Sequence, residues 1–337
     1  MMLKELALWP QKITAGLEGA QDFMTQYGTR IPKNIKKIAF VGMGGSGIAG
    51  RIIKTFLDKK ADIITQTIDT NELPANIGTD TIVCVTSYSG DTWETLDVLR
   101  ELAHRFIPTI VLTHGGGAAL LAETKNIPLW ITPESVTPRS ALGNFLGFWL
   151  GVLDKLGIIE GEKIAHIFRD HALTFIPQFE QGESYFKDFL STVQHADFFH
   201  LWGIRDVNDA MVYRAQTQFN ENSKVQSVLA VFPELNHNLI NGFEQYTTNP
   251  CILFYTTEFL TAHISKAVDA TSEILKERGV LLYKPPVLGN TLEGQLFNTI
   301  LWSDYASYYL GKIRGVDIEA VKVITKLKEA LKAKGIK

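Results

Sequence analysis

The fold of this chain is decided by residues 38–47, which read IAFVGMGGSG. The apolar run 38–41 has the length of a short buried β-strand, and the glycine-rich segment 42–47 follows it without a spacer. From about residue 46 to residue 59 the pattern is helical. A strand that turns through glycines directly into a helix begins a βαβ unit, so this stretch predicts an α/β fold with a parallel sheet.

The same alternation of strands and helices occurs on both sides of a charged segment at 160–194, which reads as a helical connector. We therefore predict a duplicated α/β fold, in which each half has a mainly parallel sheet flanked by helices. The segments 40–46 and 201–207, which start the two halves, share no residue motif, so the duplication is one of structure. The predicted strands are 38–41, 62–68, 81–86, 109–113, 126–132, 197–201, 251–255 and 280–283. The predicted boundaries are 1–155 for the N-terminal domain, 156–194 for the connector and 195–337 for the C-terminal domain.

The composition is that of an ordinary globular protein, with 45% hydrophobic and 20% charged residues among 337. A formal net charge of −3, without a long block of lysine or arginine, argues against nucleic acid as a partner. The longest uncharged stretches are 106–122, which Pro108 and glycines interrupt, and 140–153, which is too short to cross a bilayer. We expect neither nucleic acid nor a membrane as a partner.

The two cysteines, Cys84 and Cys251, both lie in apolar strand-like runs. Buried free thiols are typical of proteins in a reducing compartment. Residues 1–26 mix charged and apolar residues at helical spacing, which is not the pattern of a signal peptide. We therefore expect a cytoplasmic protein.

The glycine-rich loop is a candidate anion site, because glycines allow close backbone approach and a helix N-terminus offers free N–H groups. Its spacing also fits G-x-G-x-x-G, and Asp69 lies near the end of the second predicted strand, as in dinucleotide-binding folds. The loop alone supports the dinucleotide and the non-dinucleotide interpretation equally.

The end of the third predicted strand favours a phosphate. Residues 87–92 read SYSGDT and again turn into a helix, so Ser87, Ser89 and Thr92 place three hydroxyls beside a helix N-terminus. An ordinary N-cap is the simpler interpretation, but one hydroxyl would be enough for it. Ligands of parallel sheets bind at the carboxyl ends of the strands, so we interpret the three hydroxyls as a site for one phosphate.

Two further segments carry proton chemistry. Residues 220–224 read NENSK and residues 232–238 read FPELNHN, so a carboxylate, a cation, an imidazole and several amides flank the strand-like run 225–231. Loops that serve only as turns rarely need that set of groups. The pattern indicates a site that moves protons on a polar substrate.

Together these motifs resemble the sugar-isomerase (SIS) domain signature, and in particular the bifunctional phosphoglucose/phosphomannose isomerases. The resemblance covers nearly the whole chain and includes several motifs in the same order. They are GMGGSG at 42–47, SYSGDT at 87–92, PRSALG at 138–143, NENSK at 220–224, PELNHN at 233–238, SDY at 303–305, RGVD at 314–317 and Leu327-Lys328.

The resemblance implies two SIS-type doubly wound subdomains, a homodimer with its active sites at the subunit boundary, and a sugar-phosphate substrate. It implies isomerisation through an enediol, without a metal or redox cofactor. Glu221 would be the base that moves the proton, His237 would open the sugar ring in the partner's site, and Lys328 would assist ring opening. Arg139 would stabilise the enediolate. The implied phosphate-binding residues are Gly45, Ser46, Ser87, Ser89 and Thr92.

Alternatives remain for the base and for the substrate. Glu221 by itself could be a helix-end carboxylate paired with Lys224, and Glu234 is a second candidate base, although its place after Pro233 suits a carboxylate that supports its loop. Where family members often carry Glu, this chain has Leu239, and residues 318–320 read IEA instead of the usual Pro-Thr-Pro. The family associates a threonine there with room for the mannose epimer, so the mannose activity is in more doubt than the glucose activity.

Two other functions compete with this isomerisation. An SIS sensor binds a sugar phosphate without turnover, but it should lose the base and the imidazole and usually carries a partner domain. An isomerase of amino-sugar phosphates is the other alternative, made weaker by the lack of a recognisable glutaminase domain.

Overall fold

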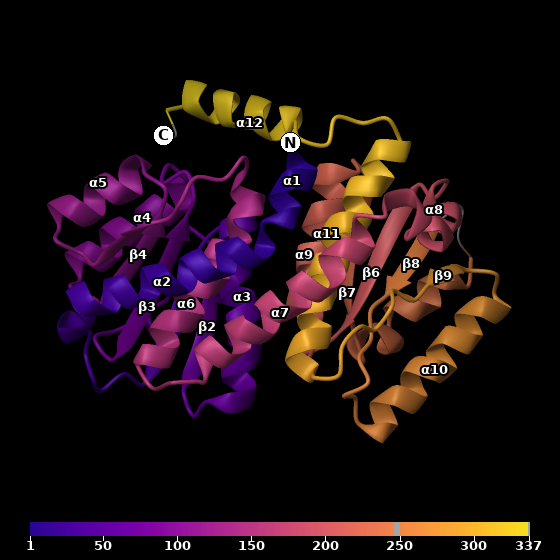
Figure 1. The fold of residues 1–337 in the computed structure, drawn as a ribbon, viewed down its shortest axis with the longest axis horizontal. Coiled ribbons are helices and arrows are strands. Elements are labelled where there is room, and N and C mark those ends of the chain that lie inside the picture. The colour runs from indigo at the N-terminus through magenta and orange to yellow at the C-terminus, as the bar shows by residue number, and fades with distance from the viewer. Residues whose placement is uncertain (246–249, 336–337) are drawn as a thin grey trace. The chain divides into compact units, whose positions relative to one another are not determined.

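The computed structural model describes residues 1–245 and 250–335. By its internal contacts the chain divides into two compact units (Figure 1). The first contains Leu3–Arg169 and the chain from Val321 onward, and the second contains Asp170–Ala320. The division falls inside helix α7 (Gly161–Phe179), so the predicted connector 156–194 contributes to both units.

The first unit is built on a five-stranded, entirely parallel sheet with the order β2-β1-β3-β4-β5. This confirms the parallel sheet predicted for the N-terminal half. Its strands are β1 (Lys37–Val41), β2 (Ile64–Ile68), β3 (Thr81–Ser87), β4 (Thr109–Thr113) and β5 (Leu129–Ile131).

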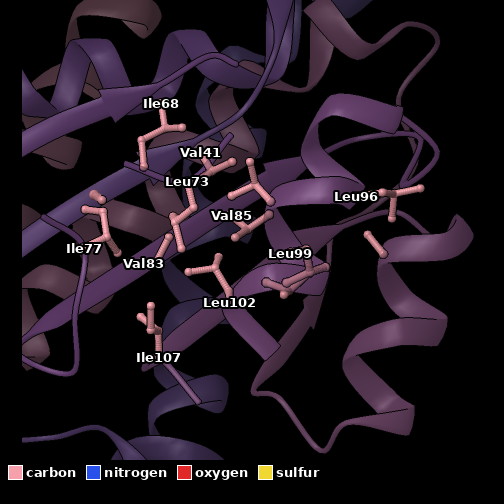
Figure 2. Close-up of a cluster of buried hydrophobic side chains, with 14 of the residues drawn as sticks. Val41, Ile68, Leu73, Ile77, Val83, Val85, Leu96, Leu99, Leu102 and Ile107 are labelled. Carbon is pink, nitrogen blue, oxygen red and sulfur yellow. The ribbon is translucent and has the colours of Figure 1, made fainter. Parts of the chain in front are cut away.

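Helices cover both faces of this sheet, because alternate strand residues point to opposite sides. On one face a buried cluster joins the strands to α4 (Trp93–His104) and α5 (Gly116–Thr124); Figure 2 shows Val83 and Val85 of β3 beside Leu99 and Leu102 of α4. On the other face α3 (Gly44–Lys60) and α6 (Leu142–Lys155) pack, and the Trp149 indole N–H donates to Thr86 Oγ1 at 2.9 Å.

Helices α2 (Trp9–Tyr27) and α6 meet along a ridge of glycines. A Cβ added at Gly147 would lie 2.3 Å from the Ile13 carbonyl oxygen, and one at Gly16 would lie 2.4 Å from the Asn144 carbonyl oxygen. These separations are too short for any side chain, so the two helix backbones touch directly. We call Gly16, Gly143, Gly147 and Gly151 the glycine ridge.

The second unit repeats the arrangement with a four-stranded parallel sheet in the order β7-β6-β8-β9. This order matches β2-β1-β3-β4 of the first unit, as the predicted duplication requires. The strands are β6 (Phe198–Ile204), β7 (Gln226–Phe232), β8 (Pro250–Phe254) and β9 (Leu281–Tyr283).

Helices also flank the second sheet on both sides. Phe219 of α9 (Asp209–Asn222) packs its ring against Phe199 of β6, on the face that α8 (Lys187–Val193) and α11 (Leu292–Ile313) share. On the other face Trp202 and Phe254 belong to a cluster that includes Val268 and Leu275 of α10 (Ala262–Glu277). The remaining elements are α1 (Met2–Ala7), η1 (Gly28–Arg30), η2 (Pro138–Ala141), η3 (Gly182–Ser184), η4 (Glu234–His237), η5 (Leu239–Phe243) and α12 (Lys322–Ala333).

The structure also bears on the expectations about membrane-crossing segments and about the two cysteines. In the described part of the chain, no helix combines the length and the apolar character that crossing a bilayer would need. Both cysteines are buried and free, and burial raises the pKa of Cys251 to about 12.

Candidate active site

The glycine loop between β1 and α3 makes a turn that only glycine permits. A Cβ at Gly47 would lie 2.4 Å from the Gly42 carbonyl oxygen, so the two ends of the loop close on each other. Met43, the N-cap of α3, makes no side-chain capping hydrogen bond within the described residues. Asp69, the acidic residue of the dinucleotide interpretation, is paired with Arg51 of α3.

The loop after β3 lies against the glycine loop, because the Tyr88 N–H donates to Ser46 Oγ at 3.0 Å. Ser87 is 2% exposed, and its Oγ has no hydrogen-bond partner among the described residues. Ser89 Oγ accepts from the Asp91 N–H at 3.3 Å. Thr92 occupies the N-cap position of α4 without a side-chain capping hydrogen bond in the described structure.

Neighbouring loops hold this arrangement from the side. Gly90 has φ +73°, and a Cβ there would lie 1.8 Å from the Gly115 carbonyl oxygen, so the loops after β3 and β4 are in direct backbone contact. The Tyr88 ring stacks on His114 with centroids 5.3 Å apart, and its hydroxyl donates to the Ser135 carbonyl at 2.7 Å. Burial raises the pKa of Tyr88 above its ordinary range, so its hydroxyl remains a hydrogen-bond donor in this contact.

Arg139 lies in η2 and is 4% exposed. Its backbone packs on the glycine loop, since a Cβ at Gly45 would lie 3.3 Å from the Arg139 Cα. Lys12 of α2 fixes η2 through a 2.6 Å hydrogen bond from Nζ to the Ser140 carbonyl oxygen. Within the first unit the structure thus brings together Gly45, Arg139 and the four hydroxyl residues that we call the hydroxyl cup: Ser46, Ser87, Ser89 and Thr92.

Glu221 is half-buried in the last turn of α9, in the second unit. The chain reverses directly after it: Lys224 has φ +55°, and its Nζ donates to the carbonyl oxygens of Glu221 and Ala320. The strand β7 then starts at Gln226. The carboxylate therefore stands at the amino end of the second sheet.

His237 is exposed at the end of η4, which follows the carboxyl end of β7. Hydrogen bonds of the two neighbouring asparagines hold the loop on both sides of the imidazole. Asn236 donates to Thr271 Oγ1 at 2.7 Å, and Asn238 donates to the Glu234 carboxylate at 3.1 Å. Glu234 is thus a hydrogen-bond acceptor within its own loop, as expected of a supporting carboxylate.

Glu221 and His237 of one chain lie beyond opposite ends of the same strand. The seven residues of β7 span about 20 Å at a rise of roughly 3.3 Å per residue. Catalytic proton transfer requires contact at hydrogen-bond distance, roughly 2.6–3.2 Å. The two side chains of a single chain therefore cannot act on neighbouring atoms of one sugar.

Lys328 is exposed on α12, a helix whose described residues include no buried side chain. In the described ranges no group of three or more His, Cys, Asp or Glu side chains is arranged to hold a metal ion.

The motifs did not reveal the polar contacts between α9 and α11. Arg214 and Asp304 form a buried bidentate ion pair with two N–O distances of 3.0 Å, and Ser307 bonds with the end of α9. A signal was present in the sequence, because Asp304 is the one charged residue between Glu293 and Lys312 of a long helix. A buried charge requires a partner, so this pattern could have indicated that a partner exists, but not which residue it is.

Comparison with known proteins identifies the family and the fold. Residues 33–143 match the SIS domain family, and residues 188–331 match the bacterial phospho-glucose isomerase C-terminal SIS domain. A bifunctional phosphoglucose/phosphomannose isomerase from Thermoplasma volcanium is 30% identical, covering 88% of this chain and 91% of the relative. The protein of that name from Caldicellulosiruptor bescii is 28% identical, covering 89% and 90%. The solved structure of tagatose-6-phosphate ketose/aldose isomerase from Escherichia coli shares the fold, with a TM-score of 0.69 and 13% identity over 95% of each chain.

Proposed function

The chain belongs to the bifunctional phosphoglucose/phosphomannose isomerase family, and on that basis we propose that it interconverts glucose 6-phosphate and fructose 6-phosphate, and mannose 6-phosphate with the same ketose. In this aldose–ketose isomerisation a proton moves between C1 and C2 through an enediol. The reaction needs a phosphate anchor, a base for that proton, a cation beside the enediolate oxygen and an acid/base group that opens the ring. None of these parts requires a metal or a redox cofactor.

The observation that carries the proposal is the hydroxyl cup. Helices α3 and α4 begin there without a side-chain cap in the described structure, and the buried Ser87 hydroxyl has no partner among the described residues. Uncapped helix N-termini attract anions, and a buried unpaired hydroxyl is costly unless a ligand completes it. The cup therefore supports binding of the substrate phosphate, with Gly45 allowing close approach of the backbone.

The proton transfer is assigned to Glu221. A single carboxylate can remove the proton from C2 and return it to C1, because the same base faces both carbons of the planar enediol. Arg139 would stabilise the enediolate oxygen, since its guanidinium stays charged at any relevant pH. Glu234 is the weaker candidate, because its carboxylate already accepts a hydrogen bond from Asn238.

Ring opening is assigned to His237 of the partner subunit, with Lys328 assisting. An imidazole can both donate and accept a proton, as ring opening requires. The span of about 20 Å along β7 supports a homodimer in which each site takes Glu221 from one chain and His237 from the other. We place this enzyme in the cytoplasm, in keeping with its two buried free cysteines.

A coupled assay tests the activity. Fructose 6-phosphate formation is measured from glucose 6-phosphate and from mannose 6-phosphate, with EDTA present and glucosamine 6-phosphate as a third substrate. Turnover of the first two is expected. Binding without turnover would favour the sensor, turnover of the amino sugar alone would favour the other isomerase, and loss of activity with EDTA would contradict the metal-free mechanism.

The assignment of the base and the shared site have their own tests. Glu221→Gln should lower kcat by about 10²–10⁴-fold, the usual contribution of a positioned general base, with little change in substrate binding. A near-normal kcat would transfer the role to Glu234. Mixing inactive Glu221→Gln and His237→Ala chains should restore activity in heterodimers, and heterodimers that form but stay inactive would contradict the shared site.

A further inference from the structure

The two residues that follow Glu221 are both held by one serine of α11. Asn222 donates from Nδ2 to Ser307 Oγ at 3.0 Å, and Ser223 donates from Oγ to the Ser307 carbonyl oxygen at 2.7 Å. All three residues are fully buried. Because buried hydrogen bonds of this kind have few alternative partners, the backbone next to Glu221 follows the position of Ser307.

The end of α9 also touches the backbone of α11. A Cβ at Gly311 would lie 2.5 Å from the Asn222 carbonyl oxygen, so the two helices approach there more closely than any side chain allows. Gly311 lies one turn beyond Ser307 on the same helix, and the same residue of α9, Asn222, meets both. The turn that carries Glu221 is therefore held against a short segment of α11.

A second connection further along the helices fixes their relative position. The Arg214 guanidinium and the Asp304 carboxylate are 1% and 0% exposed, and they pair through Nε and Nη2 at 3.0 Å each. Ser307 Oγ in turn donates to the Asp304 carbonyl oxygen at 2.9 Å. A buried bidentate pair fixes direction as well as distance, so α9 cannot slide or rotate on α11 without breaking it.

We propose that Ser307 is a positioning residue for the proton transfer, through which α11 sets the direction of the Glu221 carboxylate. This inference rests on the proposed role of Glu221 as base. Ser307 touches no substrate in this scheme; its hydroxyl acts by fixing Asn222, whereas its carbonyl, which accepts from Ser223, would remain with any residue at this position. A base displaced by about 1 Å can lose about 10²-fold in rate, whereas binding through the hydroxyl cup would be unaffected.

The chain offers a matched control one turn away. Ser303 is also fully buried on α11, and its Oγ bonds with the hydroxyl of Tyr255, in the loop after β8, at 2.9 Å. Ser303→Ala removes one buried hydroxyl and its bond with Tyr255, and Ser307→Ala removes one buried hydroxyl and its bonds with Asn222 and the Asp304 carbonyl. A purely structural role for Ser307 predicts similar losses of stability and of kcat in both variants.

The experiment compares kcat, KM and thermal unfolding of Ser307→Ala, Ser303→Ala and Glu221→Gln. We expect kcat of Ser307→Ala to fall about 10–100-fold with KM within about twofold, and kcat of Ser303→Ala to stay near wild type. Asn222→Ala combined with Ser307→Ala should lower kcat no further than either alone, because both act through one contact. If Ser307→Ala does not fold, Asn222→Ala alone tests the same hydrogen bond by the same criterion.

Two results would overturn the proposal, and they differ from a failure of the proposed function. Equal kcat in Ser307→Ala and Ser303→Ala would remove the positioning role, and so would additive losses in the Asn222→Ala and Ser307→Ala pair. A normal kcat in Glu221→Gln would instead show that another group is the base, whatever the serine variants do.

Discussion

The carboxyl ends of the two sheets differ in chemistry although their strand order is the same. In the first unit the loops after β1 and β3 carry two helix N-termini without side-chain caps in the described structure, and the Ser87 hydroxyl is buried without a described partner. No acidic residue stands in the first turn of α3, which is fully described. These are the features of a site that an anion completes.

In the second unit the side chains of Asn208 and Gln295 bond the equivalent loops to one another, although α9, like α3 and α4, begins without a side-chain cap in the described structure. Asn208, fully buried, accepts from the Ile204 N–H at 2.6 Å and donates to the Tyr255 carbonyl at 3.1 Å. Gln295 accepts from the Thr257 hydroxyl at 2.5 Å and from the Glu258 N–H at 3.0 Å. Asparagine and glutamine supply both donor and acceptor, so each can satisfy two loops at once.

The difference shows how one fold serves two purposes. A parallel sheet always places loop N–H groups and helix N-termini at its carboxyl end. Where a side chain of the protein bonds the loops together, the region is structural; where the hydroxyls of the loop are left open, the proposed function places the substrate phosphate. In the proposed mechanism the second unit supplies Glu221, which stands at the amino end of its sheet.

The largest difference between the two units is expected in KM, when a negative charge is added beside the hydroxyl cup of the first unit. Gly44 has φ +49°, a conformation that Asp and Asn tolerate, and a Cβ there would meet no described atom within 4 Å. Two unit charges 4 Å apart repel by about 4 kcal/mol at an effective dielectric of 20, so Gly44→Asp should raise KM for glucose 6-phosphate by about 10²–10³-fold. Steady-state kinetics measure this, with the uncharged isostere Gly44→Asn as control. Equal KM values in both variants would mean that the N-terminus of α3 does not bind the substrate phosphate.

Changes at Asn208, in the corresponding loops of the second unit, should lower the free energy of unfolding and leave KM unchanged. Asn208→Ala leaves the Ile204 N–H and the Tyr255 carbonyl unpaired in a buried place, which should cost about 3 kcal/mol of unfolding free energy. Chemical denaturation of the full chain measures the loss of unfolding free energy, and KM should remain unchanged. A raised KM with normal stability would mean that the second sheet binds substrate as well.

Removing one hydroxyl from each unit should have smaller effects: on KM in the first unit and on stability in the second. Ser87→Ala should raise KM about tenfold, the value of about 1.5 kcal/mol for a hydrogen bond to a charged group, without lowering the stability of the unliganded protein. Thr257→Val should lower stability by about 1–2 kcal/mol, because Gln295 loses a donor, and should leave KM unchanged. Kinetics and thermal unfolding of both variants check this, and a destabilised Ser87→Ala would mean that its hydroxyl already has a partner.

The smallest effect concerns pH. Burial lowers the pKa of His171 and of His200, both in the second unit, below the ordinary value of about 6.5. Because each prefers the neutral form when folded, their contribution to stability is complete above about pH 6.5 and is lost as the pH falls below it. Thermal unfolding at pH 7.5 and pH 5.5 should show a lower midpoint at pH 5.5, and His171→Gln should reduce that difference. An unchanged difference would exclude His171 as a contributor.

The sequence was sufficient for the features that local patterns encode. The strand and helix alternation, the parallel sheets and the repeated order follow from periodicity over a few residues, and the structure agrees. The grouping of the hydroxyl cup with Arg139 follows from the rule that ligands gather at the carboxyl ends of parallel strands.

Long-range pairs could not be predicted in this way. Arg214 bonds with Asp304 across 90 positions and Asn222 with Ser307 across 85, and no local signal states which buried polar groups meet. The bonds of Gln295 to Thr257 and Glu258 could not be predicted either, because in the sequence Gln295 resembles any polar residue near the start of a helix. The roles of Glu221, His237 and Lys328 remain predictions.

The glycine ridge has a consequence for the order in which the molecule is made. Helix α2 has its tightest contacts with α6, whose last residue, Lys155, leaves the ribosome more than a hundred residues later. At about 5–20 residues per second, α2 waits roughly 6–25 s for this surface. Throughout that interval its buried face is open to chaperones. A larger residue at Gly147 would extend this exposure indefinitely, so its harm should appear first as low yield from newly made chains and only then as lost activity.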